Sequence, residues 1–314
     1  MMSEKMATRE AYGATLVKLG ATRDFVVLDA DLAAATKTGM FKKAFPDRFF
    51  DCGIAEGNMM SVAAGIAATG VTPFVSTFAM FAAGRAFEQV RNSIAYPHLN
   101  VKICATHAGI TVGEDGATHQ CNEDISLMRT IPGMTVINPA DAVETEAAVT
   151  AALDFDGPMY IRLGRAPVPT LNDRPDYRFE IGKGYVLAGG TDVTLVATGY
   201  MVHLALEARD ILAAEGISAR VVNIHTIKPL DTTLITACAE DTGAVVTAEE
   251  HSIIGGLGSA VAECLADTCP TPLERVGVRD TFGKSGTVPA LLEKFGLTAP
   301  EIAAAARRAI ARKK

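Results

Sequence analysis

The chain has 314 residues, of which 49% are hydrophobic and 21% are charged, and its formal net charge at pH 7 is −7. This is an ordinary globular composition, and the length can hold two domains of normal size. Because the chain is acidic and lacks a long basic run, it offers no electrostatic footprint for nucleic acid or an anionic membrane.

The N-terminal segment, MMSEKMATRE, is too charged for a secretory signal. The longest apolar runs fall well short of the ~20 residues that a membrane-spanning helix needs. The six cysteines are scattered and form no CxxC pair, which is typical of reduced thiols and argues against zinc or iron–sulfur ligation. We therefore expect a cytoplasmic protein with neither a nucleic-acid nor a membrane partner.

The predicted elements of the first half alternate between helices and apolar strands. The predicted helices are 8–20, 57–70, 81–96, 123–131 and 141–153, and the predicted strands are 25–30, 49–54, 72–77, 100–106, 134–139 and 158–164. The strands are unbroken apolar runs, so we expect them to be buried on both faces. Buried strands with helical crossovers predict a mostly parallel sheet in a doubly wound α/β domain.

A Pro-rich and charged stretch after Arg165 interrupts this pattern and indicates a linker. A second alternating series follows, which includes a predicted strand at 219–227, and it predicts a smaller α/β domain. We place the first domain at 1–168, the linker at 169–185 and the second domain at 186–314.

Three polar loops should lie at the carboxyl ends of parallel strands, where open sheets bind ligands: 29–32, 53–58 and 106–120. The third loop contains three glycines, two acids, and His107 and His119 near its ends. A metal site and an ordinary solvated loop are both possible, but a polar small-molecule site is favoured because loops this long are usually functional. Histidine titrates near neutrality, which suits proton transfer to a hydroxyl or carbonyl group.

Glu56 is the only ionisable residue in the opening turn of the helix that follows the strand FFDCGI. The helix is uncharged and mostly small or apolar as far as Val71, so we expect it to be buried nearly all round. A carboxyl group in such surroundings loses hydration, which favours its protonated form or a partner with a proton to share. Glu56 is therefore either a helix cap or a working acid, and the second hypothesis is favoured.

Other candidates carry weaker signals. The glycine-rich stretch 249–260 lacks the spacing of a phosphate loop, so close helix–strand packing is the better interpretation. His203 and His225 lie in apolar elements and are interpreted as core or edge histidines, and Phe78 and Phe81 would by default be core. Arg162 and Arg165, at a strand's carboxyl end, are reasonable phosphate ligands.

Five motifs occur together in one known family. The order DADL, FFDCGIAEGNM, STFAMFAAGRAFEQVR, THAGITVGEDGATHQ and EEHSIIGGLGSAVAE resembles the C-terminal half of transketolases, and specifically the separate small subunit of split transketolases. The likeness runs from TREAYG to the final helices, and GEDGATHQ is its most specific marker. Other thiamine-diphosphate enzymes, such as deoxyxylulose-phosphate synthases and 2-oxo acid dehydrogenases, share the GIAE-like and EEH motifs but not the two-histidine loop.

The resemblance implies a pyrimidine-binding domain followed by a transketolase C-terminal domain, and thiamine diphosphate as the cofactor. It implies that Glu56 binds the aminopyrimidine ring, that Phe78 and Phe81 belong to the pyrimidine pocket, and that Asp31 lies near the pyrimidine end. It further implies that the substrate channel is lined by His107, Asp115, His119 and Arg165, with Arg165 on the phosphate and the two histidines in catalytic roles.

The chain departs from the family pattern in three places. It has no GDG…N motif, so the diphosphate and its Mg²⁺ or Ca²⁺ are expected on a large partner subunit, in an α₂β₂ assembly with a shared site. Ala33 and Ala35 replace hydroxyls expected near a substrate phosphate, and Gly57 replaces a common glutamine. The last two departures put the usual pentose-phosphate substrates in doubt.

The resemblance therefore implies a transketolase (glycolaldehyde transferase) subunit of carbohydrate metabolism that is inactive without its partner. It would help to move a two-carbon ketol unit from a ketose phosphate to an aldose. The alternatives are half of a deoxyxylulose-phosphate synthase-like or 2-oxo acid dehydrogenase-like enzyme, and a non-catalytic scaffold subunit.

Overall fold

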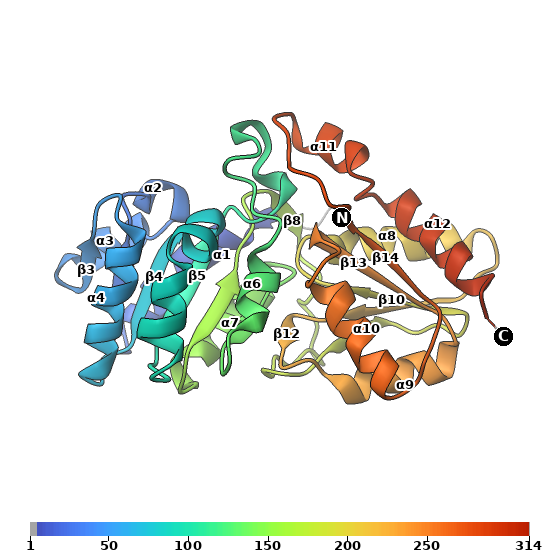
Figure 1. Cartoon of the computed structure of the whole chain (residues 1–314), viewed down its shortest axis with the longest axis horizontal. Helices are drawn as coiled ribbons and strands as arrows, with labels where there is room; N and C mark the ends of the chain where they lie inside the picture. Colours follow the sequence, from blue (N-terminus) through green and yellow to red (C-terminus); the bar gives the residue numbers. More distant parts are fainter. Residues whose placement is uncertain (1–4, 314) are drawn as a thin grey trace.

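The computed structural model describes residues 5–313 as two α/β domains side by side (Figure 1). The first domain is built on a seven-stranded sheet with the order β12-β6-β7-β5-β4-β2-β3. Its strands are β2 (Val26–Asp29), β3 (Phe49–Asp51), β4 (Pro73–Phe78), β5 (Lys102–Thr106), β6 (Thr135–Ile137), β7 (Met159–Arg162) and β12 (Thr226–Lys228). All neighbours are parallel except β12, which runs antiparallel to β6. The predicted doubly wound, mostly parallel fold is confirmed.

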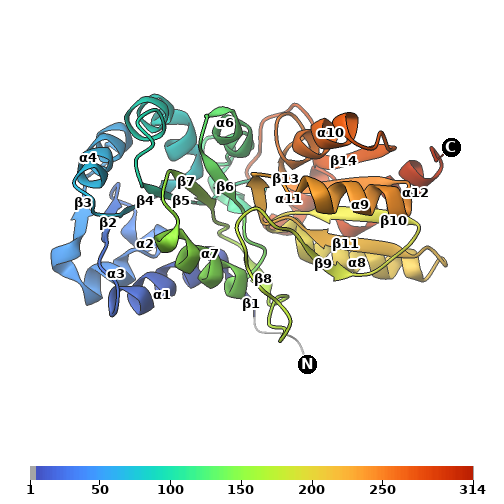
Figure 2. The same ribbon diagram turned by 90° about the horizontal axis from the view of Figure 1, so that it is seen from below.

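Helices cover both faces of this sheet (Figure 2). One face carries α4 (Glu56–Ala68), the helical segments η2 (Phe81–Arg85), α5 (Phe87–Gln89) and η3 (Val90–Ala95), and α6 (Asp124–Thr130). The other carries α1 (Thr8–Gly20), α3 (Gly39–Ala44) and α7 (Ala142–Asp154). Between β2 and β3 lie also α2 (Ala33–Thr36) and the 3-10 turn η1 (Pro46–Arg48).

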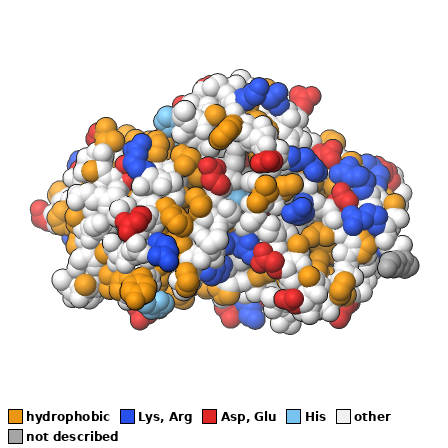
Figure 3. Space-filling model, in the orientation of Figure 1, with side chains coloured by type: hydrophobic (Ala, Val, Ile, Leu, Met, Phe, Trp, Pro, Cys, Tyr) orange, Lys and Arg blue, Asp and Glu red, His pale blue; other side chains and the backbone are white. Residues whose placement is uncertain are grey.

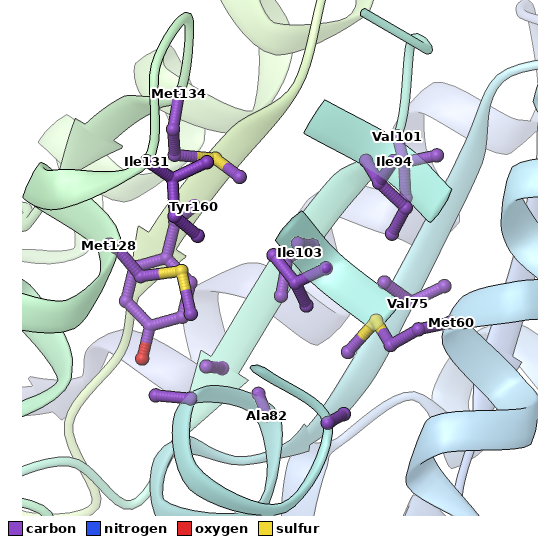
Figure 4. Packing of buried hydrophobic residues seen from close by; sticks show 14 of the residues in the cluster. Met60, Val75, Ala82, Ile94, Val101, Ile103, Met128, Ile131, Met134 and Tyr160 are labelled. Carbon is purple, nitrogen blue, oxygen red and sulfur yellow. The ribbon is translucent and has the colours of Figure 1, made fainter. Parts of the chain in front are cut away.

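The core of the first face is packed from side chains of many elements. Met60 of α4 faces Val75 of β4, while Ile103, Met128 and Tyr160 fill the space beside them (Figure 4). Every strand residue of β4 and β5 is buried, as their unbroken apolar runs predict.

The second domain has a five-stranded sheet with the order β14-β13-β10-β11-β9, in which only β9 is antiparallel to its neighbour. Its strands are β9 (Tyr185–Ala188), β10 (Val193–Ala197), β11 (Ala219–Asn223), β13 (Val245–Ser252) and β14 (Leu273–Val278). The helices are α8 (Met201–Ala213), α11 (Val288–Lys294) and α12 (Ala299–Ile310) with one core cluster, and α9 (Thr232–Thr242) and α10 (Leu257–Asp267) with another.

Three predictions about elements need correction. The helix at 81–96 contains two π-helical turns, η2 and η3, and the predicted strand at 219–227 is two strands, β11 and β12, that join different sheets. A short strand, β8 (Pro167–Pro169), pairs with β1 (Lys5–Ala7) and ends at the first residue of the expected linker. Helix α4 is not buried all round, because Val62 is 41% exposed, and hydrophobic side chains are visible on the surface of this domain (Figure 3).

Polar contacts join the two domains. The buried carboxylate of Glu144 accepts hydrogen bonds from Tyr177 and Asn223, at 2.5 and 2.8 Å, and burial raises the pKa of Glu144 to about 7. Strand β12, which follows β11 of the second sheet, adds an edge to the first. The domains therefore share both backbone and side-chain bonds.

Over residues 5–313, none of the helices is long and apolar enough to cross a membrane.

Candidate active site

Glu56 begins α4 directly after β3, at the sheet edge where polar loops were expected. Its side chain is 2% exposed, and its carboxylate oxygens Oε1 and Oε2 accept hydrogen bonds from Arg85 Nη1 at 2.8 and 2.9 Å. The cap of the helix is Ala55, which makes no side-chain cap bond, so Glu56 does not act as the cap. The proton-sharing partner that its burial requires is thus Arg85 in this chain.

The aromatic rings of Phe78 and Phe81 stack on each other close to Glu56. Their rings are stacked with centroids 5.8 Å apart, and Phe78 stacks on the His107 ring at 3.9 Å. His119 meets Phe81 edge-on at 5.5 Å. Both phenylalanines therefore belong to this ring cluster, which replaces the default interpretation of them as core residues.

His107 follows β5 and has a left-handed backbone with φ 56°, which is uncommon for a residue with a side chain. Arg9 Nη1 lies 3.0 Å from its Nε2. Because a guanidinium can only donate, Nε2 accepts, and the Nδ1 proton is directed to Thr106 Oγ1 at 2.8 Å. Burial, and then the Arg9 charge, lowers the pKa of His107 to about 3. His107 is neutral at pH 7, in contrast to the expectation that it titrates near neutrality.

The loop 106–120 is ordered by contacts with the second domain. The Thr111 amide donates to Glu250 Oε1 at 2.5 Å, and Gln120 Nε2 donates to the Lys284 carbonyl at 2.9 Å. A 3-10 turn, η4 (Ile110–Asp115), lies within the loop and packs on α11. The first part of the loop is buried, so it is not an ordinary solvated loop.

Asp115, in the loop 106–120, lies close to Arg165, which follows β7. Arg165 Nη1 is 3.9 Å from Asp115 Oδ2 and 3.7 Å from Glu114 Oε2, and it also donates to the Val112 carbonyl. The side chain of Arg165 is 35% exposed, so its guanidinium is accessible to an anion.

Arg162 is a structural residue, which corrects its interpretation as a phosphate ligand. Its side chain is 3% exposed, with Nε donating to Asp124 Oδ2 at 2.8 Å and Nη2 to the Glu250 carbonyl at 2.9 Å. The glycine-rich stretch 249–260 is likewise structural. The Glu249 carboxylate accepts the Leu257 and Gly258 amides at 2.7 and 2.8 Å, so the N-terminus of α10 is already capped by an acid.

Asp31 lies after β2, at the neighbouring strand end, with φ 60°, and its amide donates to Asp51 Oδ1. The loop behind it is held by the buried Asp29, whose Oδ2 accepts the Thr36 and Thr38 hydroxyls at 2.7 and 2.8 Å. The carbonyl of Ala35 in this loop accepts a second hydrogen bond from Arg9 Nη1, at 2.9 Å.

An open cleft of about 750 Å³ lies next to these groups, lined by Phe81, Arg85, Thr118, Gln120 and the 84%-exposed Phe282. Its size suits a cofactor or small-molecule ligand. The segment described, 5–313, contains no group of three or more His, Cys, Asp or Glu side chains that could hold a metal ion.

Sequence reasoning missed Arg9, Arg85 and Glu250. Arg9 reaches His107 across 98 positions, and Glu250 reaches Thr111 across 139. For Arg85 a local signal exists, because it stands four positions after Phe81 in a helical segment and its Cζ lies 4.5 Å from the Phe81 ring centroid.

Comparison with known proteins identifies both domains. The transketolase pyrimidine-binding domain matches residues 4–170, and the transketolase C-terminal domain matches residues 182–302. The chain belongs to the transketolase family. It is 50% identical to a putative transketolase C-terminal section of Methanocaldococcus jannaschii, with 94% of this chain and 93% of that relative covered.

Two further relatives are separate subunits. A 6-deoxy-6-sulfo-D-fructose transketolase subunit of Clostridium sp. is 49% identical, with 97% of this chain and 95% of that subunit covered. A solved split-gene transketolase, described as an inactive β₄ tetramer, is 58% identical with a TM-score of 0.92, over 98% of this chain and 100% of that one. This chain is therefore a small subunit of the split-transketolase type, and it belongs to a class of thiamine-dependent transferases. Its split-type relatives imply a large partner subunit.

The residues of the site fit a thiamine-type cofactor. An aminopyrimidine ring needs a carboxyl group for its ring nitrogen and an aromatic face beside it, and both are present here: Phe81 lines the cleft, and Glu56 lies behind Arg85. The planar guanidinium of Arg85 already makes both kinds of contact there.

Proposed function

We propose that this chain and a large subunit together form an enzyme that transfers a two-carbon ketol unit from an anionic ketose to an aldose. The observation that carries the proposal is one cluster of side chains, in which Phe78 stacks on Phe81 and on His107, His119 meets Phe81 edge-on, and Arg85 links Phe81 to Glu56. This cluster would bring a cofactor acid and substrate-facing imidazoles together beside the cleft that Phe81 lines.

The cofactor residues have separate tasks. Glu56 would hold a proton at the aminopyrimidine ring nitrogen, Phe78 and Phe81 would fix the ring plane, and Asp31 would face its outer end. Thiamine diphosphate, when bound, supplies the electron sink that the cleavage of a ketose carbon–carbon bond needs. The diphosphate and its Mg²⁺ or Ca²⁺ would be held by the large subunit, in an α₂β₂ assembly.

The substrate would lie along the loop 106–120. His107 is neutral and would meet a sugar hydroxyl once its bond to Arg9 or Thr106 opens, Asp115 would bind the donor's 2-hydroxyl, and His119 would exchange a proton with the reacting oxygen. The anionic end of the sugar would meet Arg165 and Arg9. Both guanidinium groups, and the ammonium group of Lys37, act electrostatically on His107, so three cations converge there.

The anion itself is either a phosphate or a sulfonate. Ala33 and Ala35 lack side-chain hydroxyls that could donate a hydrogen bond to the anion, in addition to those from Arg165 and Arg9. A phosphate, which carries more charge than a sulfonate, would be bound better with such a third donor from this loop. The Clostridium relative is named for a sulfo-sugar, which supports including sulfonates among the donors tested.

The test is reconstitution with a large subunit that carries the GDG…N motif, thiamine diphosphate and Mg²⁺. Ketol transfer to ribose 5-phosphate is measured with xylulose 5-phosphate and with 6-deoxy-6-sulfofructose as donors. Transfer from at least one donor, and only with both chains present, is the expected result. Pyruvate decarboxylation without ketol transfer would contradict the proposal in favour of a synthase- or dehydrogenase-like enzyme, and an assembled complex that binds no cofactor would favour a scaffold.

A further inference from the structure

Arg85 lies between the two groups to which the proposed function assigns the cofactor ring. Its Nη1 donates to both carboxylate oxygens of Glu56, at 2.8 and 2.9 Å, and its Cζ lies 4.5 Å from the centroid of Phe81. The Glu56 carboxylate is 2% exposed, so Arg85, at 52%, is the group that separates it from the cleft. No part of the proposed function uses this guanidinium.

Other groups already pack against the ring of Phe81. Phe78 stacks on it at 5.8 Å with an angle of 17° between the ring planes, and His119 meets it edge-on at 5.5 Å. Arg85 covers the ring as well as both Glu56 oxygens. An aromatic ring that must touch Phe81 and Glu56 together cannot reach both while Arg85 stays in place.

A guanidinium and an aminopyrimidine present similar chemistry to such a site. Both are planar, both stack on an aromatic face, and both offer an N–H edge to a carboxylate. We propose that Arg85 is an internal occupant of the pyrimidine subsite, which satisfies Glu56 in the unloaded chain and is displaced when the cofactor binds. This inference rests on the proposed function and adds a competing residue to its cofactor site.

The position of Arg85 would allow its side chain to move away from Glu56. Arg85 ends the π-helical turn η2, which widens the backbone next to Phe81, and π turns of this kind occur mostly at functional sites. Its half-exposed side chain opens onto the cleft of about 750 Å³, and the carboxylate-bearing Glu123 and Asp280 line the same cleft. A displaced guanidinium therefore has both space and alternative acceptors.

Because Arg85 must move before the cofactor binds, the apparent affinity for the cofactor is lower than the intrinsic affinity. The size of the effect is set by the ratio of chains in which Arg85 occupies the subsite to chains in which it has moved away. Removal of the guanidinium should remove this competition. Since Glu56 is buried but Arg85 is half-exposed, we expect an effect of about tenfold in Kd.

The test uses the reconstituted heteromer and measures thiamine diphosphate binding by calorimetry in the presence of Mg²⁺. Arg85→Gln should lower Kd about tenfold, whereas the matched control Arg91→Gln, an exposed arginine of η3 outside the cleft, should leave Kd unchanged. Equal or weaker binding by Arg85→Gln would overturn the inference. A wild-type heteromer that binds no cofactor would overturn the proposed function itself, and the inference with it.

Because Arg85→Gln leaves a buried carboxylate without its cation, a second measurement uses the wild-type protein. A crystal structure of the heteromer with thiamine diphosphate should show Arg85 turned away and Glu56 bonded to the pyrimidine ring. A contact between Glu56 and Arg85 that persists at 2.8–2.9 Å beside a bound ring would contradict the inference.

Discussion

At the scale of single residues, the site is a set of buried polar groups that are hydrogen-bonded to arginines. Arg9 donates to His107, and Arg85 donates to both carboxylate oxygens of Glu56. Glu56, Phe78 and Phe81 could be singled out from the sequence because a lone acid and two spaced rings stand out locally. Arg9 could not, since its contact with His107 depends on how β5 and α1 lie in space.

The depressed pKa of His107 has a measurable effect on stability. The unfolded chain binds a proton near pH 6.5, while the folded chain binds none until about pH 3, so stability falls as pH falls between these values. His107→Gln should remove up to about 1.4 kcal/mol per pH unit of this dependence, measured by urea unfolding between pH 4 and 6.5. The exposed His98→Gln serves as the control. A wild-type pH dependence in His107→Gln would show that the histidine is protonated in the folded chain.

At the scale of elements, the second domain positions the substrate loop of the first. Glu250, at the end of β13, accepts the Thr111 amide of η4, and its own carbonyl accepts Arg162. Burial raises the pKa of Glu250 to about 7. The loop that carries His107, Asp115 and His119 is therefore fixed from outside its own domain, so under the proposed function the C-terminal domain would contribute to substrate binding.

Removal of this support should affect the substrate more than the cofactor. Glu250→Ala leaves a buried amide without an acceptor, at a cost of about 1–3 kcal/mol, so KM for the sugar donor should rise about tenfold. Cofactor affinity should change by less than about twofold, because Glu56 and Phe81 lie on other elements. Glu250→Gln, which keeps the acceptor oxygen, should be much milder. Equal losses in cofactor and sugar binding would indicate general unfolding of the site instead.

The parallel strands could be predicted because each is a long apolar run with a strong local signal. The π turns and β12 could not. A π turn changes the helical period by one residue within a segment that remains helical, so the sequence pattern hardly changes. Strand β12 joins the first sheet only through pairing with β6, almost 90 positions earlier, which no local pattern indicates.

At the scale of the whole molecule, the chain carries the proposed cofactor acid, Glu56, but lacks the GDG…N motif that would hold a diphosphate. The cleft beside Phe81 and Arg85 is open, and the exposed Phe282 of the second domain lines it. Ile254, two positions after the lining residue Ser252, is also exposed. Apolar side chains exposed next to a polar site are typical of an interaction surface. We therefore expect the large subunit to cover this cleft and to complete the site.

The most direct test of this account is a mixing experiment with Glu56→Gln. A fixed amount of large subunit is titrated with wild-type chain, with Glu56→Gln and with the control Glu88→Gln, in saturating thiamine diphosphate and Mg²⁺. Assembly and ketol transfer are both measured. Glu56→Gln should assemble as well as wild type, because the amide has the same size and shape as the carboxylate, yet lose activity by roughly 10²–10⁴-fold. Full activity in an assembled Glu56→Gln complex would contradict the claim that this chain supplies the catalytic acid of a shared site.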